Sequence, residues 1–257
     1  MQKEIQTSLA SLNLKSIRYF ESIGSTNDEA LAWAAQGTED LSLVLADEQT
    51  SGRGRAGRKW ASPRGDSISL SLILRPRAGE ADSPSLFTGL AALALVDALK
   101  QRRLTAQIKW PNDVLLNQKK CAGILVESVW SGDALDAVVI GVGVNVLAGS
   151  VPHESELLFP ATSLESELGH APNRSDLLRD VLSALLKWRP LMNQQPFIQA
   201  WEAALAFKGQ MVRVWRDNET PLEGIVMGLA PDGNLRLLSN DKIVTVHFGE
   251  IHLRPAL

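Results

Sequence analysis

Residues 137–146 constrain the fold more than any other segment, because the two faces of this stretch differ completely. Its even positions carry Val138, Ile140, Val142, Val144 and Val146, whereas its odd positions include Gly141, Gly143 and Asn145. Alternation with a period of two predicts a β-strand whose branched side chains pack in a core. The opposite face is stripped of side chains, so that either a flat ligand or another backbone can approach it closely.

The remaining patterns divide the chain into a large mixed unit and a small all-β unit. In the first we expect strands at Ile17–Phe20, Leu41–Ala46, Ser67–Leu74, Gln107–Trp110, Val114–Asn117 and Cys121–Val129. Helices are expected after a Ser25/Asp28 capping box and at Leu86–Leu104, Ser175–Trp188 and Pro196–Phe207. Beyond Gly209, closely spaced strands are expected at Met211–Trp215, Leu222–Leu229, Leu235–Leu238 and Ile243–Phe248. We therefore predict two domains, residues 1–207 and residues 208–257, the second a small β-barrel.

Composition excludes several classes of protein. With 26 basic and 29 acidic residues the formal net charge is −3, which argues against a nucleic-acid coat, and we expect no nucleic-acid partner. The single cysteine, Cys121, rules out a disulfide scaffold. The N-terminus lacks the apolar core of a signal peptide, and the longest apolar stretch, near residues 86–99, is too short to span a bilayer. We expect a cytoplasmic protein without a membrane partner.

Residues 49–60 form a loop with three arginines, one lysine and three glycines. Gly52, Gly54 and Gly57 satisfy the dinucleotide fingerprint, but that fingerprint requires a helix at its third glycine, and an alternating strand follows here. The loop is then either a solvated basic loop or one that closes over a ligand carrying carboxylate or phosphate. The other motifs favour the second interpretation.

Residues 109–113, Lys-Trp-Pro-Asn-Asp, place a cation and an anion at the end of a strand. Asp113 beside Asn112 offers oxygen ligands for Mg²⁺ near substrate phosphates, although Pro-Asn-Asp is equally good turn chemistry. Lys120 follows at the rim of a predicted hairpin, where lysines are usually solvated, with Gly123 close behind.

The sequence offers no convincing set of residues for nucleophilic catalysis. Cys121 lies in a predicted strand beside Ala122, which is typical of a small buried hydrophobic residue rather than an acyl-carrying thiol. The four histidines, at positions 153, 170, 247 and 252, are scattered, and we interpret them as surface or core residues rather than ligands.

Taken together, these motifs resemble one family, the biotin protein ligases, which attach biotin to the biotin carboxyl carrier domain of carboxylases. The matching segments, in family order, are STNDEA from Ser25, DEQTSGRGRAGRKW from Asp47, KWPNDVLL from Lys109, KKCAGILVE from Lys119 and IGVGVNV from Ile140. The resemblance runs from about Phe20 to the C-terminus. It implies an α+β fold, with a central mixed β-sheet flanked by helices, as in class II synthetase-like biotin and lipoate ligases, and a C-terminal SH3-like β-barrel.

The resemblance also implies an activity: ATP-dependent formation of biotinyl-5′-AMP and transfer of biotin to a lysine of a biotin carboxyl carrier protein, with ATP, Mg²⁺ and biotin as cofactors or substrates. The expected catalytic residues are Lys120, Arg55 and Asp113, and Asn112 and Asp113 would serve the nucleotide and Mg²⁺. Contacts to biotin or its adenylate are implied for Ser25, Thr26, Asn27, Gln49, Arg53, Gly54, Arg55, Arg58, Trp60, Lys120, Gly123 and Gly143.

Two departures from the family pattern stand out. The family often has paired arginines where this chain has Arg55 followed by Ala56, so we expect altered retention of the adenylate rather than lost activity. Some members carry an N-terminal DNA-binding domain, whereas only some 20 residues precede the catalytic pattern here, so we expect no repressor activity. A lipoate ligase and a non-catalytic sensor of biotin or nucleotide remain the alternatives, and the sequence leaves open whether the chain forms a homodimer.

Overall fold

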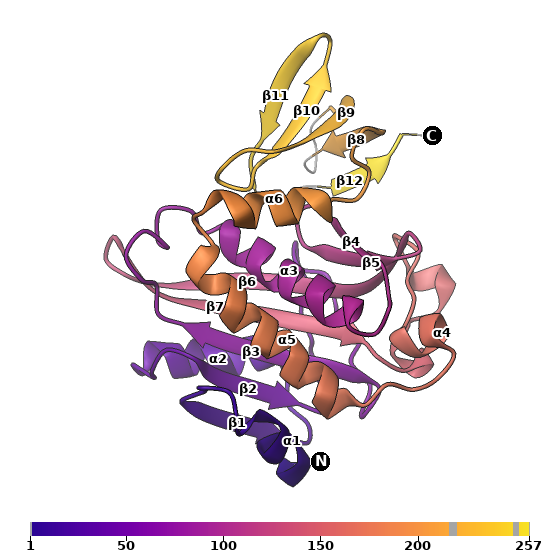
Figure 1. Cartoon of the computed structure of the whole chain (residues 1–257). Helices are drawn as coiled ribbons and strands as arrows, with labels where there is room; N and C mark the ends of the chain where they lie inside the picture. Colours follow the sequence, from indigo (N-terminus) through magenta and orange to yellow (C-terminus); the bar gives the residue numbers. More distant parts are fainter. Residues whose placement is uncertain (1, 216–219, 249–251, 257) are drawn as a thin grey trace.

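The computed structural model describes residues 2–215, 220–248 and 252–256, which form two β-sheets and the helices around them (Figure 1). Within these ranges the first sheet has seven strands in the order β1-β2-β3-β7-β6-β5-β4. Their bounds are β1 Ser16–Phe20, β2 Ser42–Ala46, β3 Ser67–Leu74, β4 Ala106–Lys109, β5 Asp113–Leu116, β6 Lys119–Ser131 and β7 Ala134–Asn145. Strands β1 and β2 are parallel, and the other neighbours are antiparallel. The sheet is therefore mixed, as predicted.

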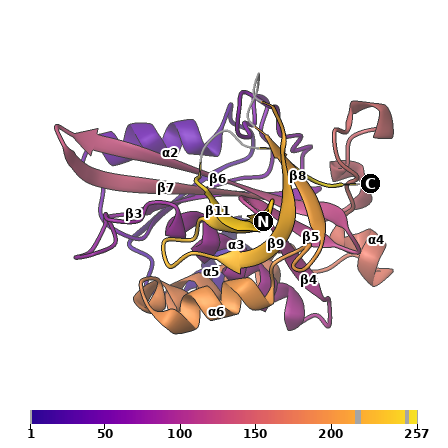
Figure 2. The same ribbon diagram turned by 90° about the horizontal axis from the view of Figure 1, so that it is seen from above.

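Helices cover both faces of this sheet. Their bounds are α1 Gln2–Leu9, α2 Thr26–Ala35, α3 Leu86–Lys100, α4 Leu164–Leu168, α5 Arg174–Trp188 and α6 Gln195–Ala203, with 3-10 turns η1 Ala148–Ser150, η2 Glu154–Glu156 and η3 Arg189–Leu191. Seen from above, α2 lies on one side of the sheet, and α3 and α5 lie on the other (Figure 2). Burying both faces explains why strand β3 is buried along its whole length.

The side-chain alternation of β3 decides which face holds the polar residues. Its even-numbered leucines and isoleucine join the main core beneath α3, while Ile73 joins the smaller core beneath α2. Ser67, Ser69 and Ser71 point to the same side as Ile73, because residues two apart share a face of a strand. Gly141 pairs with Ser71 and Gly143 with Ser69 across to β7. The α2 side of the sheet is therefore polar and short of side-chain bulk next to the helix.

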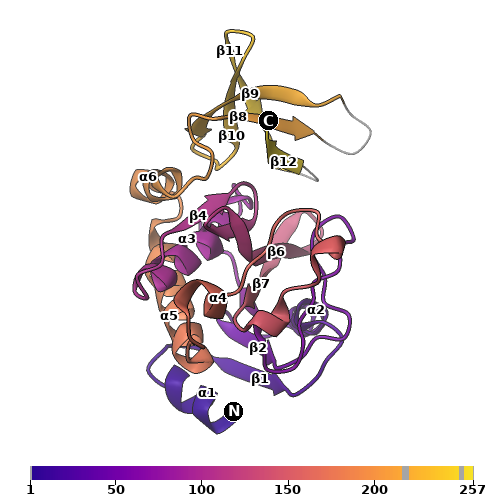
Figure 3. The same cartoon turned by 90° about the vertical axis from the view of Figure 1, so that its right-hand side faces the viewer.

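The second sheet is antiparallel and contains, in the described ranges, β8 Met211–Trp215, β9 Leu222–Leu229, β10 Leu235–Ser239, β11 Lys242–Val246 and β12 His252–Pro255. It sits at one end of the molecule, against α6 and β4, with the N-terminus at the opposite end (Figure 3). Buried Trp110 joins the two parts: its Nε1 donates to the carbonyl of Gly233 at 3.0 Å, and its ring meets Phe248 edge-on at 5.0 Å. The predicted small all-β unit is confirmed as this five-stranded sheet.

Several predicted boundaries were wrong by a few residues. The helix expected at Leu86–Leu104 ends at Lys100, because Arg103 adopts φ +61° and the Leu104 amide donates back to the carbonyl of Leu99. The helix expected to reach Phe207 ends at Ala203, where the chain turns to pair with the edge strand β4. The sequence interpretation missed α1, α4 and β12, which are short. In α1 only Ile5 and Leu9 reach the core.

Within the described part of the chain, no helix is long and apolar enough to cross a membrane.

Candidate active site

The arginine-rich loop is a small hairpin, which we call the arginine hairpin (residues 52–60). Arg53 and Lys59 form an antiparallel bridge, and the amide of Gly54 donates to the carbonyl of Arg58 at 2.7 Å. At the tip, Ala56 and Gly57 adopt φ +53° and +67°, and the Arg58 amide donates back to Arg55. Two consecutive left-handed residues are what a tight two-residue hairpin turn requires. The loop is thus preformed, with Arg55 and Arg58 flanking its turn.

Two glycines on neighbouring strands form the floor beneath this hairpin. Gly123 on β6 pairs directly with Gly143 on β7. The Trp60 indole lies against both: a Cβ on Gly123 would be 3.0 Å from Trp60 Cζ3, and a Cβ on Gly143 would collide with the ring. The Trp60 Nε1 is buried with no hydrogen-bond partner. The Trp60 side chain therefore covers the glycine face of β7 in this structure. The sequence had allowed for a flat ligand or another backbone on that face.

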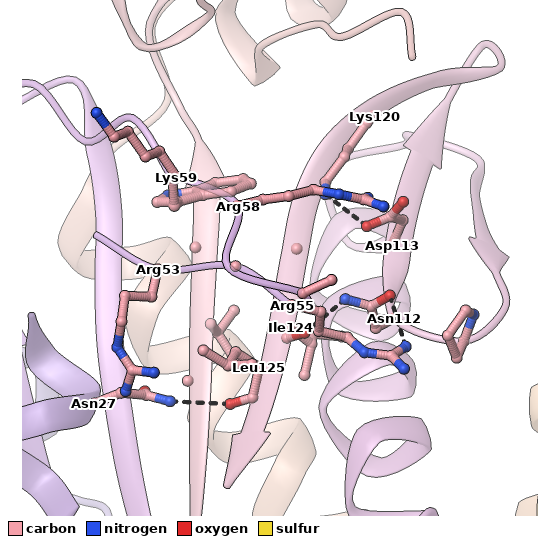
Figure 4. A pocket seen from close by; sticks show the side chains of 18 of the residues that line it. Asn27, Arg53, Arg55, Arg58, Lys59, Asn112, Asp113, Lys120, Ile124 and Leu125 are labelled. Atoms are coloured by element: carbon pink, nitrogen blue, oxygen red, sulfur yellow. Dashed lines mark hydrogen bonds and ion pairs between the residues drawn. The ribbon is translucent and has the colours of Figure 1, made fainter. Parts of the chain in front are cut away.

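The start of α2 forms one wall of the site. Ser25 caps the helix by accepting from the Asp28 amide at 3.4 Å, which confirms the capping prediction. Gln49 Oε1 accepts from both the amide and the hydroxyl of Thr26, at 2.8 and 3.1 Å. Asn27 Nδ2 donates to the Leu125 carbonyl at 3.2 Å (Figure 4), and its side chain occupies the space above Gly141. This wall is a fixed set of polar groups around a buried helix start.

The opposite wall is a buried triad of charges formed by Lys109, Asp113 and Lys120. Lys120 Nζ lies 2.6 Å from Asp113 Oδ1 (Figure 4). Lys109 Nζ lies 3.0 Å from Asp113 Oδ2. Strands β4, β5 and β6 bring them together, because Lys109 pairs with Asp113 across β4 and β5, and Asp113 pairs with Gly123 on β6. The Lys109 side chain is 5% exposed and that of Lys120 27%, so only Lys120 has substantial access to the cleft.

The triad shifts the pKa values of Asp113 and Lys109. Burial alone would raise the pKa of Asp113, but the ammonium groups of Lys120 and Lys109 outweigh it and hold this pKa well below its usual range. Burial lowers the pKa of Lys109, and the Asp113 carboxylate only partly offsets that effect. One carboxylate is therefore shared by two cations.

This arrangement does not fit the Mg²⁺ site suggested by the sequence. Both oxygens of Asp113 already face an ammonium group, at distances that leave no room for a divalent cation between them. Asn112 is also engaged: its Nδ2 donates to the Ile124 carbonyl and its Oδ1 accepts from Arg55. Across the described ranges, no group of three or more His, Cys, Asp or Glu side chains is placed to hold a metal ion.

Arginines of the hairpin differ in their partners. Arg53 makes a bidentate pair with Glu127, at 3.0 and 2.8 Å, and also contacts Asp28 at 2.6 Å. It therefore fixes the base of the hairpin to β6 and α2. Arg55 Nη1 reaches Asn112 Oδ1 at 3.3 Å (Figure 4), and Arg58 Nη2 lies 2.7 Å from a ring nitrogen of His252.

All the site residues predicted from the sequence line one cleft, whose space of about 970 Å³ is partly open to solvent. The structure adds residues to that set, above all Arg254 and His252 from β12. Arg254 lies 5.1 Å from the Phe159 ring, with Lys109 at 5.0 Å from the same ring. The sequence interpretation of His252 as a surface or core residue gave it no place in the cleft. No local sequence pattern connects His252 or Arg254 to residues more than a hundred positions earlier.

The cleft is strongly cationic although the protein is net acidic. Its lining combines one carboxylate with the basic side chains of Arg53, Arg55, Arg58, Lys59, Lys109, Lys120 and Arg254. Cys121 is buried, and burial raises the pKa of its thiol to about 12, so it is no nucleophile at neutral pH. Fixed cations that line one cleft can hold two anions close together and stabilise charge that develops between them. The site therefore belongs to the class that joins anionic substrates without a protein nucleophile.

Comparison with known proteins gives the same class. Residues 19–145 match the Biotin/lipoate A/B protein ligase family, and residues 207–254 match the Biotin protein ligase C terminal domain. The chain is 39% identical over 225 residues to the biotin--[acetyl-CoA-carboxylase] ligase of Paracoccus denitrificans, covering 83% of this chain and 90% of that protein. It is 34% identical over 239 residues to the bifunctional ligase/repressor BirA of Bacillus subtilis (strain 168), covering 91% of this chain and 73% of that protein.

Similarity extends to three dimensions. The solved structure of the biotin protein ligase from Aquifex aeolicus in complex with biotin and ATP superposes with a TM-score of 0.82 at 27% identity, covering 95% of this chain and 100% of that one. The chain belongs to the biotin protein ligase family.

Proposed function

We propose that this protein activates biotin with ATP and transfers it to a lysine of a biotin carboxyl carrier protein. The observation that carries the proposal is the cleft itself: a floor of Gly123 and Gly143 lies between the buried charge triad and the arginine hairpin. Biotin and ATP are both anionic, and they are the ligands named for the Aquifex aeolicus structure. A cleft that concentrates cations suits both of them.

In the first half-reaction, a carboxylate oxygen of biotin attacks the α-phosphorus of ATP. The bond from that phosphorus to the bridging oxygen breaks, and pyrophosphate leaves with the bonding electrons. In this proposal Lys120 meets the biotin carboxylate and the α-phosphate. Its ammonium group, which contacts Asp113 and is partly open to the cleft, supports this role. Arg55 and Arg58 extend over the same cleft from the hairpin and are suited to the remaining phosphate charge.

In the second half-reaction, the amine of the carrier lysine attacks the carbonyl of biotinyl-5′-AMP. The bond from the carbonyl carbon to the phosphate oxygen breaks, AMP leaves, and the amine loses a proton. The mixed anhydride hydrolyses if water reaches it, so a hairpin that covers it has a chemical purpose. We expect Arg55→Gly to release the adenylate early; tight retention by that variant would exclude this role for Arg55.

A lipoate ligase is the alternative, because residues 19–145 match a family that includes both activities. The match of residues 207–254 to the Biotin protein ligase C terminal domain favours biotin. Biotin, and not lipoate, should support exchange of labelled pyrophosphate into ATP. Exchange with lipoate alone would reverse this assignment.

The direct test is mass spectrometry of a purified apo carrier domain after incubation with this protein, biotin and the magnesium salt of ATP. We expect a mass gain of one biotin on one carrier lysine, and its loss with Lys120→Ala. No gain from the wild-type protein would overturn the proposal. Transfer of lipoate would then support the lipoate alternative, and transfer of neither acid would support a sensor.

A further inference from the structure

The arginine hairpin contacts the C-terminal sheet through one histidine. Arg58 Nη2 lies 2.7 Å from His252 Nδ1, although the two residues are 194 positions apart. A guanidinium group only donates, so this contact requires the imidazole to accept through the lone pair of Nδ1. His252 and Arg254, both on β12, also line the cleft. The last strand of the chain therefore reaches the part of the hairpin that overhangs the substrate site.

Two features hold the imidazole in place. His252 pairs with Trp215 across β12 and β8, and the two rings stack at 5.2 Å with an interplanar angle of 22°. A ring stacked on a cross-strand neighbour has few alternative orientations. Its Nδ1 is thus presented toward Arg58 by the sheet, rather than by the hairpin that it contacts.

Arg58 transmits this contact to the rest of the hairpin. Its carbonyl accepts from Gly54 at 2.7 Å and its amide donates to Arg55 at 3.2 Å, so the position of Arg58 fixes the turn. Arg53 already fixes the base of the hairpin to Glu127 and Asp28. Near the tip, Arg55 contacts Asn112 at 3.3 Å, and the Arg58–His252 contact adds an attachment to a different sheet.

We propose that His252 is a positioning residue: it accepts a hydrogen bond from Arg58 and thereby holds the arginine hairpin over the cleft, so that the adenylate is retained until the carrier lysine arrives. The retention of the adenylate rests on the proposed function. The holding of the hairpin rests on the Arg58–His252 contact alone. It gives the C-terminal sheet a defined part in the reaction, namely closure of the site.

Three variants separate the hydrogen bond from the packing. His252→Phe keeps an aromatic ring for Trp215 but removes the acceptor. His252→Asn keeps an acceptor, because its Oδ1 is as many bonds from Cα as Nδ1 of histidine. His170→Ala is the matched control, since His170 is exposed and contacts only the backbone of Leu168 among the hydrogen bonds described.

The first measurement is the rate at which preformed biotinyl-5′-AMP leaves the full-length protein. We expect His252→Phe to release it about fivefold faster, the factor that one ordinary hydrogen bond contributes. His252→Asn should stay close to the wild type, as should His170→Ala. In an Arg58→Ala background, His252→Phe should have no further effect, because the pair acts as one unit.

The second measurement needs no activity. Trypsin cleaves after arginine and lysine, so it can cut the hairpin, and mass spectrometry measures the rate of this cleavage. We expect faster cleavage of the hairpin in His252→Phe than in His252→Asn. Unchanged release and unchanged cleavage in His252→Phe would overturn the proposal, as would additive effects with Arg58→Ala. A wild-type protein that forms no adenylate would overturn the proposed function, and with it the retention role; the cleavage rates would still decide whether His252 holds the hairpin.

Discussion

Asp113→Asn is expected to destabilise the protein because it removes the carboxylate that two lysines share. The Lys109 side chain is 5% exposed and that of Asp113 12%, so the pair is largely desolvated. Removing one member of a buried ion pair costs about 3–5 kcal/mol, since the other charge stays buried without compensation. An asparagine oxygen still accepts one hydrogen bond, so we expect about 3 kcal/mol. For a chain of this size that lowers the melting temperature by about 6 °C.

Thermal unfolding followed by circular dichroism at pH 7 measures this difference. The pH dependence has a definite sign: the pKa of Asp113 is held below its usual range, so its charge stabilises the fold above the ordinary aspartate pKa of about 4. That contribution is lost only as the pH falls through the lower, folded value. The gap between wild type and variant should therefore persist at pH 5 and narrow only in stronger acid.

The double variant Lys109→Met/Asp113→Asn is the matched control. Replacing both members of a buried pair avoids the uncompensated charge, so it should recover part of the stability lost in Asp113→Asn. If Asp113→Asn melts together with the wild type, or if the double variant is no more stable than the single one, the shared-carboxylate argument is refuted.

Three further predictions concern separate parts of the molecule. Gly143→Ala should weaken biotin binding at least about tenfold in calorimetry, because the added Cβ collides with Trp60. Gly24→Ala adds its Cβ in open space and should bind biotin normally, and equal affinities of the two variants would contradict this account of the floor. Cys121 should resist iodoacetamide at pH 8 in the folded protein and react in guanidinium chloride, since burial raises its pKa to about 12; rapid labelling of the native protein would show that the thiol is accessible. Arg189→Met should lower the free energy of unfolding in urea by about 3–5 kcal/mol, because the 1%-exposed Arg189 side chain pairs with two carboxylates; an unchanged midpoint would contradict it.

Local physics made much of the fold predictable. The alternation in Ser67–Leu74 identified β3 to the residue, and Ser25 marked the start of α2, because a strand period and a helix cap depend only on near neighbours. Ends of elements were less predictable. The helix at Leu86 stops at Lys100 through backbone bonds around Arg103, and no proline or glycine marks that stop.

For the site, short motifs identified residues that converge on one cleft, whereas their surroundings were not visible in the sequence. The motif at residues 109–113 was compatible with a metal site, but β6 brings Lys120 to the free side of Asp113 and makes that carboxylate a counter-ion. The bare face of β7 was evident, yet only the folded chain shows that Trp60 lies on it.

The alternation of strands and helices, the cationic loop and the family could be predicted from the sequence, because each depends on residues that lie close together along the chain. The sharing of Asp113 by Lys109 and Lys120, and the contact of His252 with Arg58, became evident only in the folded chain. The first contact joins three consecutive strands, β4, β5 and β6, whereas the second joins residues 194 positions apart. Their strength depends on burial and on the orientation of one side chain against another, which exist only once both sheets have packed together.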